Sequence, residues 1–296
     1  MRSLLLSIVI SCFFFHAPAQ SLTWWANNVH WDGITPWERY TTFTPGYLGP
    51  NALPVPPITN GSIDSINSIG FSGDFHFSKG DHTQNITLYG SYCLVKNKIS
   101  FDAFWVPVEH FTMSHQLKEE RKVFALRYYD RYGTGDIHLN TRIQLINNTA
   151  KKLQAALRIG YRFANSGIGA ARFTDSPGYY FDISVGKIFR SSPLKWITML
   201  GVYIWQVDNV VIRHRQDDAF LFGTGLEWNT KSFKLQSYVS GYFGYFEHFR
   251  DDPIVFRVKA DKTIKRKILF FQFQQGLHDF KYSSFELGMK FCFKEK

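Results

Sequence analysis

The sequence predicts an all-β fold, an antiparallel up-and-down β-barrel of about twelve strands. Three observations support this prediction. From residue 68 onward, apolar and polar residues alternate at every second position, which is the period of a strand with two different faces. The connections between these segments alternate between short and mostly long. Aromatic residues make up 18% of the chain, which is more ring surface than a soluble enzyme usually has to hide.

The individual strands follow from this alternation. We place them at residues 68–78, 83–95, 98–106, 134–146, 152–163, 178–188, 195–206, 219–229, 231–246, 253–259, 264–275 and 283–294. Short connections are expected at 96–97, 147–151, 190–194, 229–230 and 260–262, and longer ones at 107–133, 164–177, 207–218 and 247–252. An even strand number with short turns at one end and long loops at the other is typical of bacterial outer-membrane barrels.

The glycine-rich stretch YGTGDIHLNTRI, from Tyr132 to Ile143, resembles a phosphate-binding loop at first sight. Such a loop needs a strand before it and a helix after it, so that backbone N–H groups point at the anion. After Ile137 the apolar residues instead keep to every second position, as in a strand with one wet face. The glycines therefore mark the entry to a strand.

The two faces of the predicted strands differ strongly in charge. The apolar face includes Phe71, Phe75, Phe77, Ile86, Leu88, Tyr92, Leu157, Ile159, Phe181, Ile183, Leu200, Val202, Phe285 and Leu287. Charges that share this register are lysines toward segment ends, namely Lys187, Lys231, Lys265 and Lys267. A charge facing lipid costs about 2–4 kcal/mol at the midplane. The apolar face is therefore predicted to meet lipid, which makes the barrel transmembrane.

The opposite face is predicted to line the lumen. The candidate lumen-lining residues are Asp136, Arg142, Arg158, Arg162, Glu227, Arg257, Glu286 and Lys290. Six acids and eight bases in total lie on this face, which is nearly balanced, so strong anion selectivity does not follow from the count. Large inward groups such as Tyr203 and Trp205 suggest a lumen that is narrow or closed by internal ion pairs. Charges that only pair with one another are the alternative to a substrate path, and this alternative has at least equal weight.

A soluble β-sandwich or a lipocalin-like barrel would also show alternation, but it would bury its apolar face inward. The aromatic residues near strand ends favour the membrane barrel, because lipid interfaces enrich such side chains. These candidate girdle residues are Trp196, Trp228, Tyr161, Tyr179, Phe243 and Tyr245.

The N-terminus predicts export. Arg2 precedes an apolar run, and Ala17-Pro18-Ala19 matches a cleavage site, so residues 1–19 are expected to be a secretory signal peptide. A lipoprotein site at Cys12 is the alternative, although apolar residues continue past it. Residues 20–67 contain six prolines and predict an irregular N-terminal extension, and residues 68–296 predict the barrel. The expected location is the bacterial outer membrane.

The net charge of +10 falls to +9 when Arg2 is removed with the signal peptide. The bases are scattered along the chain, which favours outer-membrane lipid or lipopolysaccharide as the partner and argues against nucleic acid. Only Cys93 and Cys292 remain after cleavage at residue 19. In a closed barrel one strand separates them, too far for a disulfide, so both are expected to stay thiols.

Candidate chemistry in the sequence is weak. Ser114 and His115 could suggest a lipid hydrolase, but adjacent residues on a strand point to opposite faces. The tripeptide Glu-His-Phe occurs at 109–111 and at 247–249, and a metal site would require two loops to converge. We therefore predict no catalytic residues, no cofactor and no metal.

Two segments carry a resemblance to a known family. The run from Leu126 to Asp136 before a strand, and Gly276 to Phe280 before a closing strand that ends at Phe293, resemble outer-membrane barrels of the MetA phenol-degradation type. The resemblance covers about half of the chain and implies a transporter-like barrel of unspecified cargo without catalytic residues. The chain departs from the usual assembly signal because it ends in Lys294-Glu295-Lys296.

The sequence thus predicts a passive channel or transporter for small molecules. A non-conducting barrel that anchors or partners other envelope proteins is the second interpretation. An envelope lipid-modifying enzyme is the third.

Overall fold

The computed structural model describes residues 23, 26–27, 30–35, 49–63, 66–121, 129–167, 172, 177–189, 192–209, 214–244 and 252–293. The strands are β1 (Asn67–Ser78), β2 (Asp81–Val95), β3 (Ile99–Met113), β4 (Asp130–Gly133), β5 (Ile137–Asn148), β6 (Leu153–Phe163), β7 (Gly178–Ile188), β8 (Leu194–Asn209), β9 (His214–Asn229), β10 (Phe233–Gly244), β11 (Ile254–Ile264), β12 (Lys267–His278) and β13 (Ser283–Phe293). A helix, α3 (His115–Arg121), follows β3. The predicted signal peptide and the tripeptide at 247–249 lie outside the described residues.

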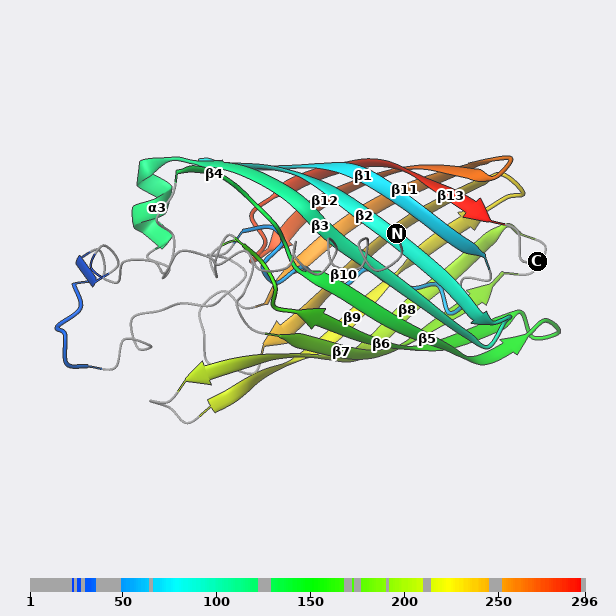
Figure 1. Ribbon diagram of the computed structural model, residues 1–296. Coiled ribbons are helices and arrows are strands. Elements are labelled where there is room, and N and C mark those ends of the chain that lie inside the picture. The colour runs from blue at the N-terminus through cyan, green and yellow to red at the C-terminus, as the bar shows by residue number, and fades with distance from the viewer. Residues whose placement is uncertain are drawn as a thin grey trace, which may run out of the picture.

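The strands form a closed antiparallel barrel. β1 pairs with β2 on one side and with β13 on the other, and β2 pairs with β3, so the strand order forms a ring. β4 and β5 lie end to end along β3, where Glu109 is opposite Gly133 and Ala103 is opposite Leu139. Because β4 and β5 together occupy one position in the ring, twelve strand positions surround the lumen, which confirms the predicted up-and-down barrel (Figure 1).

The two ends of the barrel differ. Short turns join the strands at one end, here called the turn end, where the chain also finishes β13 (Figure 1). Helix α3 and the longer connections lie at the other end, here called the loop end. None of the helices formed by the described residues has the length and apolar character of a membrane span.

One predicted turn was misplaced by a few residues. β11 continues beyond the expected turn at 260–262, and the hairpin to β12 instead turns at Lys265, whose φ is 56°. That left-handed conformation suits a two-residue turn. The extension of β11 is also stabilised inside the barrel, because Asp261 pairs with Lys234 of β10 at 3.1 Å.

β3 is longer than the alternation predicted. The sequence suggested an end at residue 106, because Pro107 lacks a backbone donor. In the structure the register between β2 and β3 shifts at this point, where Ile86 faces Val108 and Leu88 faces Trp105. This bulge accommodates the proline and lets β3 continue to Met113.

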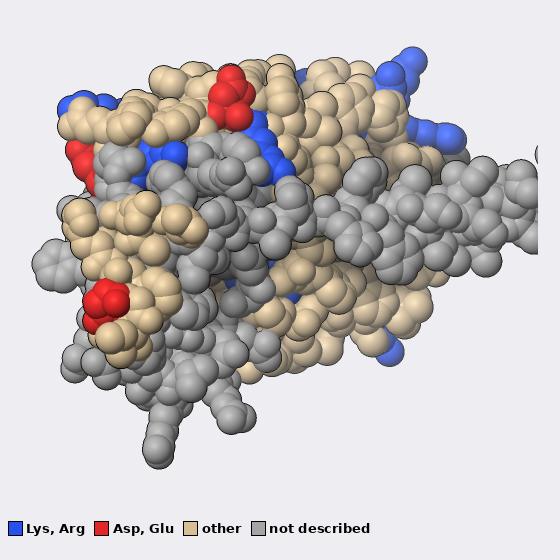
Figure 2. Space-filling model, turned by 60° about the vertical axis from the view of Figure 1, so that its left-hand side comes forward, with Lys and Arg blue, Asp and Glu red and all other residues tan. Residues whose placement is uncertain are grey.

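The outer wall is apolar, and buried charged side chains of the strands, such as Arg158 and Asp182, lie inside the barrel, as predicted. Side chains such as Phe71, Ile183, Leu200 and Leu287 are exposed on the outside. Figure 2 shows a largely tan wall with Lys and Arg side chains protruding at its turn end. A soluble barrel would have the reverse arrangement, so this distribution argues against the soluble alternative.

Aromatic side chains form a band toward each end of the outer wall. Trp196 and Trp228 are exposed near the turn end, and Tyr161 and Phe243 are exposed near the loop end. Both bands agree with the predicted girdle, in which amphipathic rings lie at the lipid–water interface. Tyr245 lies outside the described residues.

The lumen is not empty. Residues 49–63, here called the lumen segment, are mostly buried and run inside the barrel from the loop end toward the turn end. Four of these residues are proline, namely Pro50, Pro54, Pro56 and Pro57. Each proline removes an N–H group that a strandless segment could not easily satisfy, which makes this composition suitable for crossing a lumen.

Candidate functional site

The apolar residues of the lumen segment pack against one wall of the barrel. Leu53 and Val55 are only 2% and 1% exposed and belong to one buried cluster, most of whose other residues come from β7 to β11 and the rest from β3 and the chain just before β13. That cluster includes Tyr180, Ile197, Met199, Tyr203, Trp205, Ala219, Leu221, Tyr238, Tyr242 and Val255. Burial of each aliphatic side chain contributes about 1.5–3 kcal/mol. We call the wall from β6 to β10 the seat of the lumen segment.

Side chains of β6, β10 and β11 donate to the backbone of the lumen segment. Arg162 donates to the carbonyl of Ala52, and the Tyr242 hydroxyl donates to the carbonyl of Leu53 at 3.0 Å. Arg257 Nη2 donates to the carbonyl of Val55 at 2.7 Å. These carbonyls have no strand partner, so side-chain donors take the role that a sheet would otherwise have.

Further contacts hold the turn-end half of the lumen segment. Asn60 Nδ2 donates to Glu227 Oε2 at 2.9 Å, and Gln144 Nε2 donates to the carbonyl of Gly61 at 2.8 Å. The φ of Gly61 is 76°, and a Cβ there would lie 2.6 Å from the backbone nitrogen of Gly186. Only glycine fits this approach to the barrel wall.

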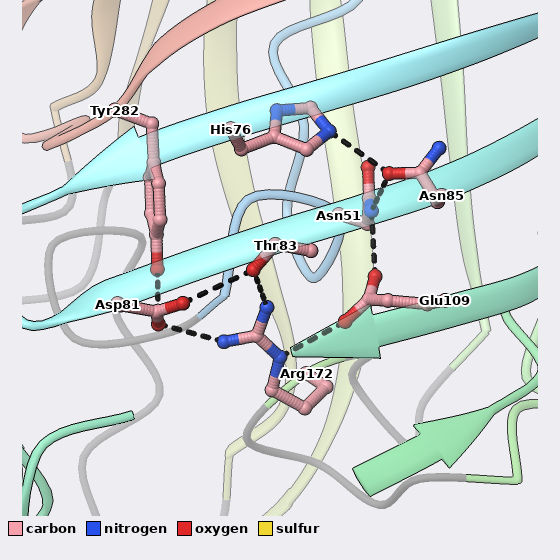
Figure 3. Close-up of polar contacts among 8 residues, drawn as sticks. All are labelled: Asn51, His76, Asp81, Thr83, Asn85, Glu109, Arg172 and Tyr282. Carbon is pink, nitrogen blue, oxygen red and sulfur yellow. Dashed lines mark hydrogen bonds and ion pairs between the residues drawn. The ribbon is translucent and has the colours of Figure 1, made fainter. Parts of the chain in front are cut away.

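A cluster of charged residues fixes the loop end, and we call it the loop-end clasp. Arg172, from the β6–β7 connection, donates through Nη1 to Asp81 at 2.7 Å and through Nε to Glu109 at 3.0 Å (Figure 3). It also donates to Thr83, and the Tyr282 hydroxyl donates to Asp81 at 2.8 Å. The clasp therefore joins a loop to β2, β3 and the residue just before β13.

The clasp holds the lumen segment as well. Asn51 Nδ2 donates to Glu109 Oε2 at 2.7 Å, on the carboxylate that also accepts from Arg172 (Figure 3). A Cβ on Gly49 would lie 2.8 Å from Arg172 Cζ, so the backbone passes directly over the guanidinium. The clasp thereby ties the loop-end part of the lumen segment to the barrel.

The charge state of Arg172 is secured by its partners. Burial by itself would lower the pKa of the guanidinium, but the carboxylates of Asp81 and Glu109 outweigh it and raise that pKa above its ordinary value. Sequence reasoning missed Arg172 because an arginine in a loop normally faces water. Its partners lie 91 and 63 residues away, and no local pattern indicates such a pairing.

Two neighbouring cavities remain beside the lumen segment. The loop-end cavity has a volume of about 260 Å³ and is lined by Asn51, Asp74, Tyr89 and Glu286, among others. The turn-end cavity has a volume of about 380 Å³ and reaches Ser91, Asn229 and Cys292. Both cavities share the lining residues Pro57, Arg142, Lys259, Phe270, Gln272 and Lys290, which we call the junction. The space follows the wall formed by β1 to β3, β5 and β10 to β13.

Four of the eight residues predicted to line the lumen are in the seat and its buried surroundings. Arg158 is 1% exposed and pairs with Asp182 at 2.7 Å, and Arg162 lies 3.9 Å from Asp136, just before β5. Glu227 accepts from Asn60 and Gln236. Of these four, Arg158 also reaches the lining of the loop-end cavity.

The other four predicted residues all line a cavity. Arg142 pairs with Asp102 at 2.7 Å, and Arg257 donates to the lumen segment. Glu286 accepts from Tyr89 and Gln272. Lys290 Nζ lies 5.3 Å from the ring centroid of Tyr89 and 5.7 Å from that of Phe270. Arg266 is one of the eight bases that the alternation places on the inward face, but in the structure it lies exposed in the β11–β12 turn.

The residues considered for catalysis have structural contacts. Ser114 Oγ accepts from the backbone N–H of Leu117 at the start of α3, and His115 stacks on Tyr129 with ring centroids 5.4 Å apart. Glu109 belongs to the clasp, while His110 contacts Asp130 at 2.8 Å. Among the described residues, no group of three His, Cys, Asp or Glu side chains is placed to hold a metal ion.

The two cysteines are not joined by a disulfide. β1 lies between their strands, because Ser68 is opposite Cys292 on β13 and opposite Ser91 on β2. The predicted separation by one strand is therefore confirmed.

No protein-family model and no curated protein matches the chain. Among solved structures, an outer-membrane channel from Pseudomonas putida F1 aligns with a TM-score of 0.58 and 10% identity, over 81% of this chain and 100% of that one. The translocator domain of the autotransporter NalP from Neisseria meningitidis aligns with a TM-score of 0.46 and 10% identity, over 78% and 89% of the two chains. The TodX monoaromatic hydrocarbon channel aligns with a TM-score of 0.39 and 8% identity, over 79% and 91%. The first of these likenesses shows that the chain has the fold of an outer-membrane channel barrel.

Proposed function

We propose that this protein is a passive outer-membrane channel for small molecules. The observation that carries the proposal is the pair of neighbouring cavities that share the junction residues and lie along one wall beside the lumen segment. Hydrophilic side chains line much of this space, which suits water and small polar solutes. Sixteen strands leave an aqueous channel and eight leave a filled interior, so a partly filled twelve-stranded lumen suits a narrow path.

Three further observations support the proposal. The outer wall has the apolar surface and aromatic bands expected of a barrel in lipid. The fold is that of an outer-membrane channel barrel. The sequence resemblance to barrels of the MetA phenol-degradation type points in the same direction, although it specifies no cargo. Export through a cleaved signal peptide at residues 1–19 belongs to the same proposal, as does contact with outer-membrane lipid or lipopolysaccharide.

The second candidate function is a non-conducting barrel that partners other envelope proteins. The lumen segment favours it, because its seat and the loop-end clasp hold it by many buried contacts. A plug that never moves would leave only the narrow path beside it. A lipid-modifying enzyme is less well supported, because Ser114 caps a helix and His115 stacks on a tyrosine; we propose that the protein is not an enzyme.

Planar-bilayer recording of the purified protein tests the proposal. The wild-type barrel is expected to give small, resolvable conductance steps. A Leu53→Asp/Val55→Asp variant places two carboxylates in the buried seat and is expected to loosen the lumen segment and raise the conductance several-fold. Leu287→Met, on the outer wall, is the control and should match the wild type.

Complete silence of both the wild type and the Leu53→Asp/Val55→Asp variant would contradict the channel and favour the non-conducting alternative. Heat-modifiable migration on gels should accompany each recording, because it verifies that the barrel of that variant has folded.

A further inference from the structure

The turn-end mouth of the barrel is ringed by basic side chains. The turns there contribute Lys96, Lys98, Lys151, Lys152, Lys231, Lys265 and Arg266, and we call these residues the basic rim. The connecting residues 96–98, 149–152, 230–232 and 265–266 contain no Asp or Glu. Figure 2 shows Lys and Arg side chains protruding at this end of the wall. A mouth of one charge sign raises the local concentration of ions of the opposite sign, here anions.

The junction inside the barrel has the same sign. Its six lining residues include Arg142, Lys259 and Lys290 and no carboxylate. The Lys259 ammonium lies 5.1 Å from the ring centroid of Phe270, and that of Lys290 lies 5.7 Å from the same ring. Phe270 therefore holds two ammonium groups close to the point where the two cavities meet.

No carboxylate lines both cavities. Asp102, which lines the loop-end cavity, pairs with Arg142 of the junction at 2.7 Å, so Lys259 and Lys290 are the residues that give the junction its positive charge. Asp74 and Glu286 are opposite each other on β1 and β13 and line the loop-end cavity alone. Neutral donors satisfy both: Asn85 and Thr87 donate to Asp74 at 2.6 Å, while Tyr89 and Gln272 donate to Glu286. The turn-end cavity has one lining carboxylate, Asp261, which pairs with Lys234. The acidic and basic residues of the lumen nearly balance in number but are unevenly distributed. The loop-end part is more acidic, whereas the junction and the turn-end mouth are basic.

We propose that the path selects small anions, with Lys259 and Lys290 as the residues that determine this selectivity. The inference rests on the proposed channel function and names its substrate class. Pro57 and Phe270 add apolar surface to the junction, and Gln272 adds an amide donor. Small organic anions that combine a carboxylate with a short apolar body fit this combination. The basic rim concentrates such anions at the turn-end mouth, and the junction discriminates between anions and cations.

Reversal potentials across a bilayer with a KCl gradient test the proposal. The wild type is expected to favour chloride over potassium. For unit charges about 5 Å apart in water, Coulomb's law gives about a fourfold gain for chloride and about a fourfold loss for potassium. The Lys259→Gln/Lys290→Gln variant should therefore lower the chloride-to-potassium permeability ratio by about 16-fold for each charge removed. Lys79→Gln, an exposed lysine between β1 and β2 at the loop end, is the matched control and should leave the ratio unchanged.

Salt dependence separates the two basic elements. A Lys96→Gln/Lys98→Gln variant of the rim should reduce anion preference at about 0.1 M salt but not at about 1 M, where the Debye length falls to about 3 Å. The junction variant should keep its effect at both salt concentrations, because its charges act at contact distance on an ion in the path.

A binding measurement distinguishes failure of this inference from failure of the proposed function. Calorimetry on the detergent-purified barrel should show butyrate binding more tightly than neutral butyramide, and the junction variant should lose this difference. If no variant conducts but butyrate still binds through the junction, the channel is refuted and the anion site stands. A conducting wild type that favours potassium, an unchanged ratio in the junction variant, or equal binding of butyrate and butyramide would each overturn the anion site.

Discussion

The two sides of this lumen are built differently. The seat, from β6 to β10, is dominated by aromatic and aliphatic side chains, among which Tyr203 and Tyr242 meet edge to face with centroids 5.2 Å apart. The opposite wall, from β11 through β13 to β3, carries Lys259, Lys290 and Glu286 around the cavities. The lumen segment packs on the first wall because apolar burial stabilises it there, and the two cavities lie along the charged wall. A barrel can thus hold a plug and a polar path side by side.

Removal of the clasp charge should have the largest effect on stability. Arg172→Met leaves Asp81 and Glu109 buried without their cation, and this is expected to cost about 3–5 kcal/mol. The loss should appear as a lower urea midpoint and as faster proteolysis at the loop end. Lys79→Met, which changes an exposed lysine at the loop end, is the control. Equal midpoints for the two variants would mean that the clasp does not hold the loop end.

Side-chain truncation should distinguish the residues of the lumen segment that pack on the seat from those that face the cavities. Leu53→Ala removes a side chain that is 2% exposed and should cost about 2–5 kcal/mol. Pro57→Ala, which changes a residue that lines both cavities, should cost less than about 1 kcal/mol. Hydrogen exchange of residues 49–63 measures both effects. Similar losses of protection in both variants would contradict the asymmetry of the lumen.

The outer surfaces of the two walls should respond alike, in contrast to their interiors. Leu200→Arg on β8 and Leu287→Arg on β13 each place a charge on the outer wall. The native residues Leu200 and Leu287 are 56% and 67% exposed, respectively. Each is expected to cost about 2–4 kcal/mol if the position lies at the bilayer midplane. Urea titration in lipid vesicles measures this cost. A variant that folds in vesicles as stably as the wild type would argue against lipid contact at that position.

Loss of the Asn60 side chain, at the turn-end half of the lumen segment, should have a smaller effect. Asn60→Ala removes one hydrogen bond to Glu227, which still accepts from Gln236, and two local hydrogen bonds that Ser62 donates to Asn60 Oδ1. The expected cost is about 1.5–3 kcal/mol at most, because the acceptor is charged but keeps one partner. Comparison of its urea midpoint with that of Asn148→Ala, in the β5–β6 turn region, provides the check. An effect as large as that of Arg172→Met would show that this contact, rather than the clasp, anchors the segment.

The smallest perturbation is chemical labelling. Cys292 lines the turn-end cavity, whereas Cys93 is 7% exposed and is absent from the lining of both cavities. A small maleimide added to the folded protein should therefore modify Cys292 faster than Cys93, as mass spectrometry of the peptides would show. Faster modification of Cys93 would contradict the position of the turn-end cavity, which Cys292 lines and Cys93 does not.

The sequence alone determined the barrel and the orientation of its wall. Period-two alternation is a local property, so the strands, the lipid face at positions such as Leu200, and the inward direction of Arg158 could all be predicted from neighbouring residues. Strand ends were less predictable. Pro107 suggested an end that a bulge avoids, and the turn at Lys265 depends on a left-handed conformation that the alternation does not reveal.

Only the tertiary structure decided what occupies the lumen. The prolines of residues 20–67 predicted an irregular extension, but nothing local indicated that residues 49–63 lie inside the barrel. Their partners are distant: Val55 accepts from Arg257 across 202 positions, and Asn60 donates to Glu227 across 167. The count of inward charges also concealed their arrangement. Asp74 and Lys259 cancel in the net charge, but they lie in different parts of the path. Local periodicity fixes which way a side chain points, whereas closure of the barrel determines which distant groups meet.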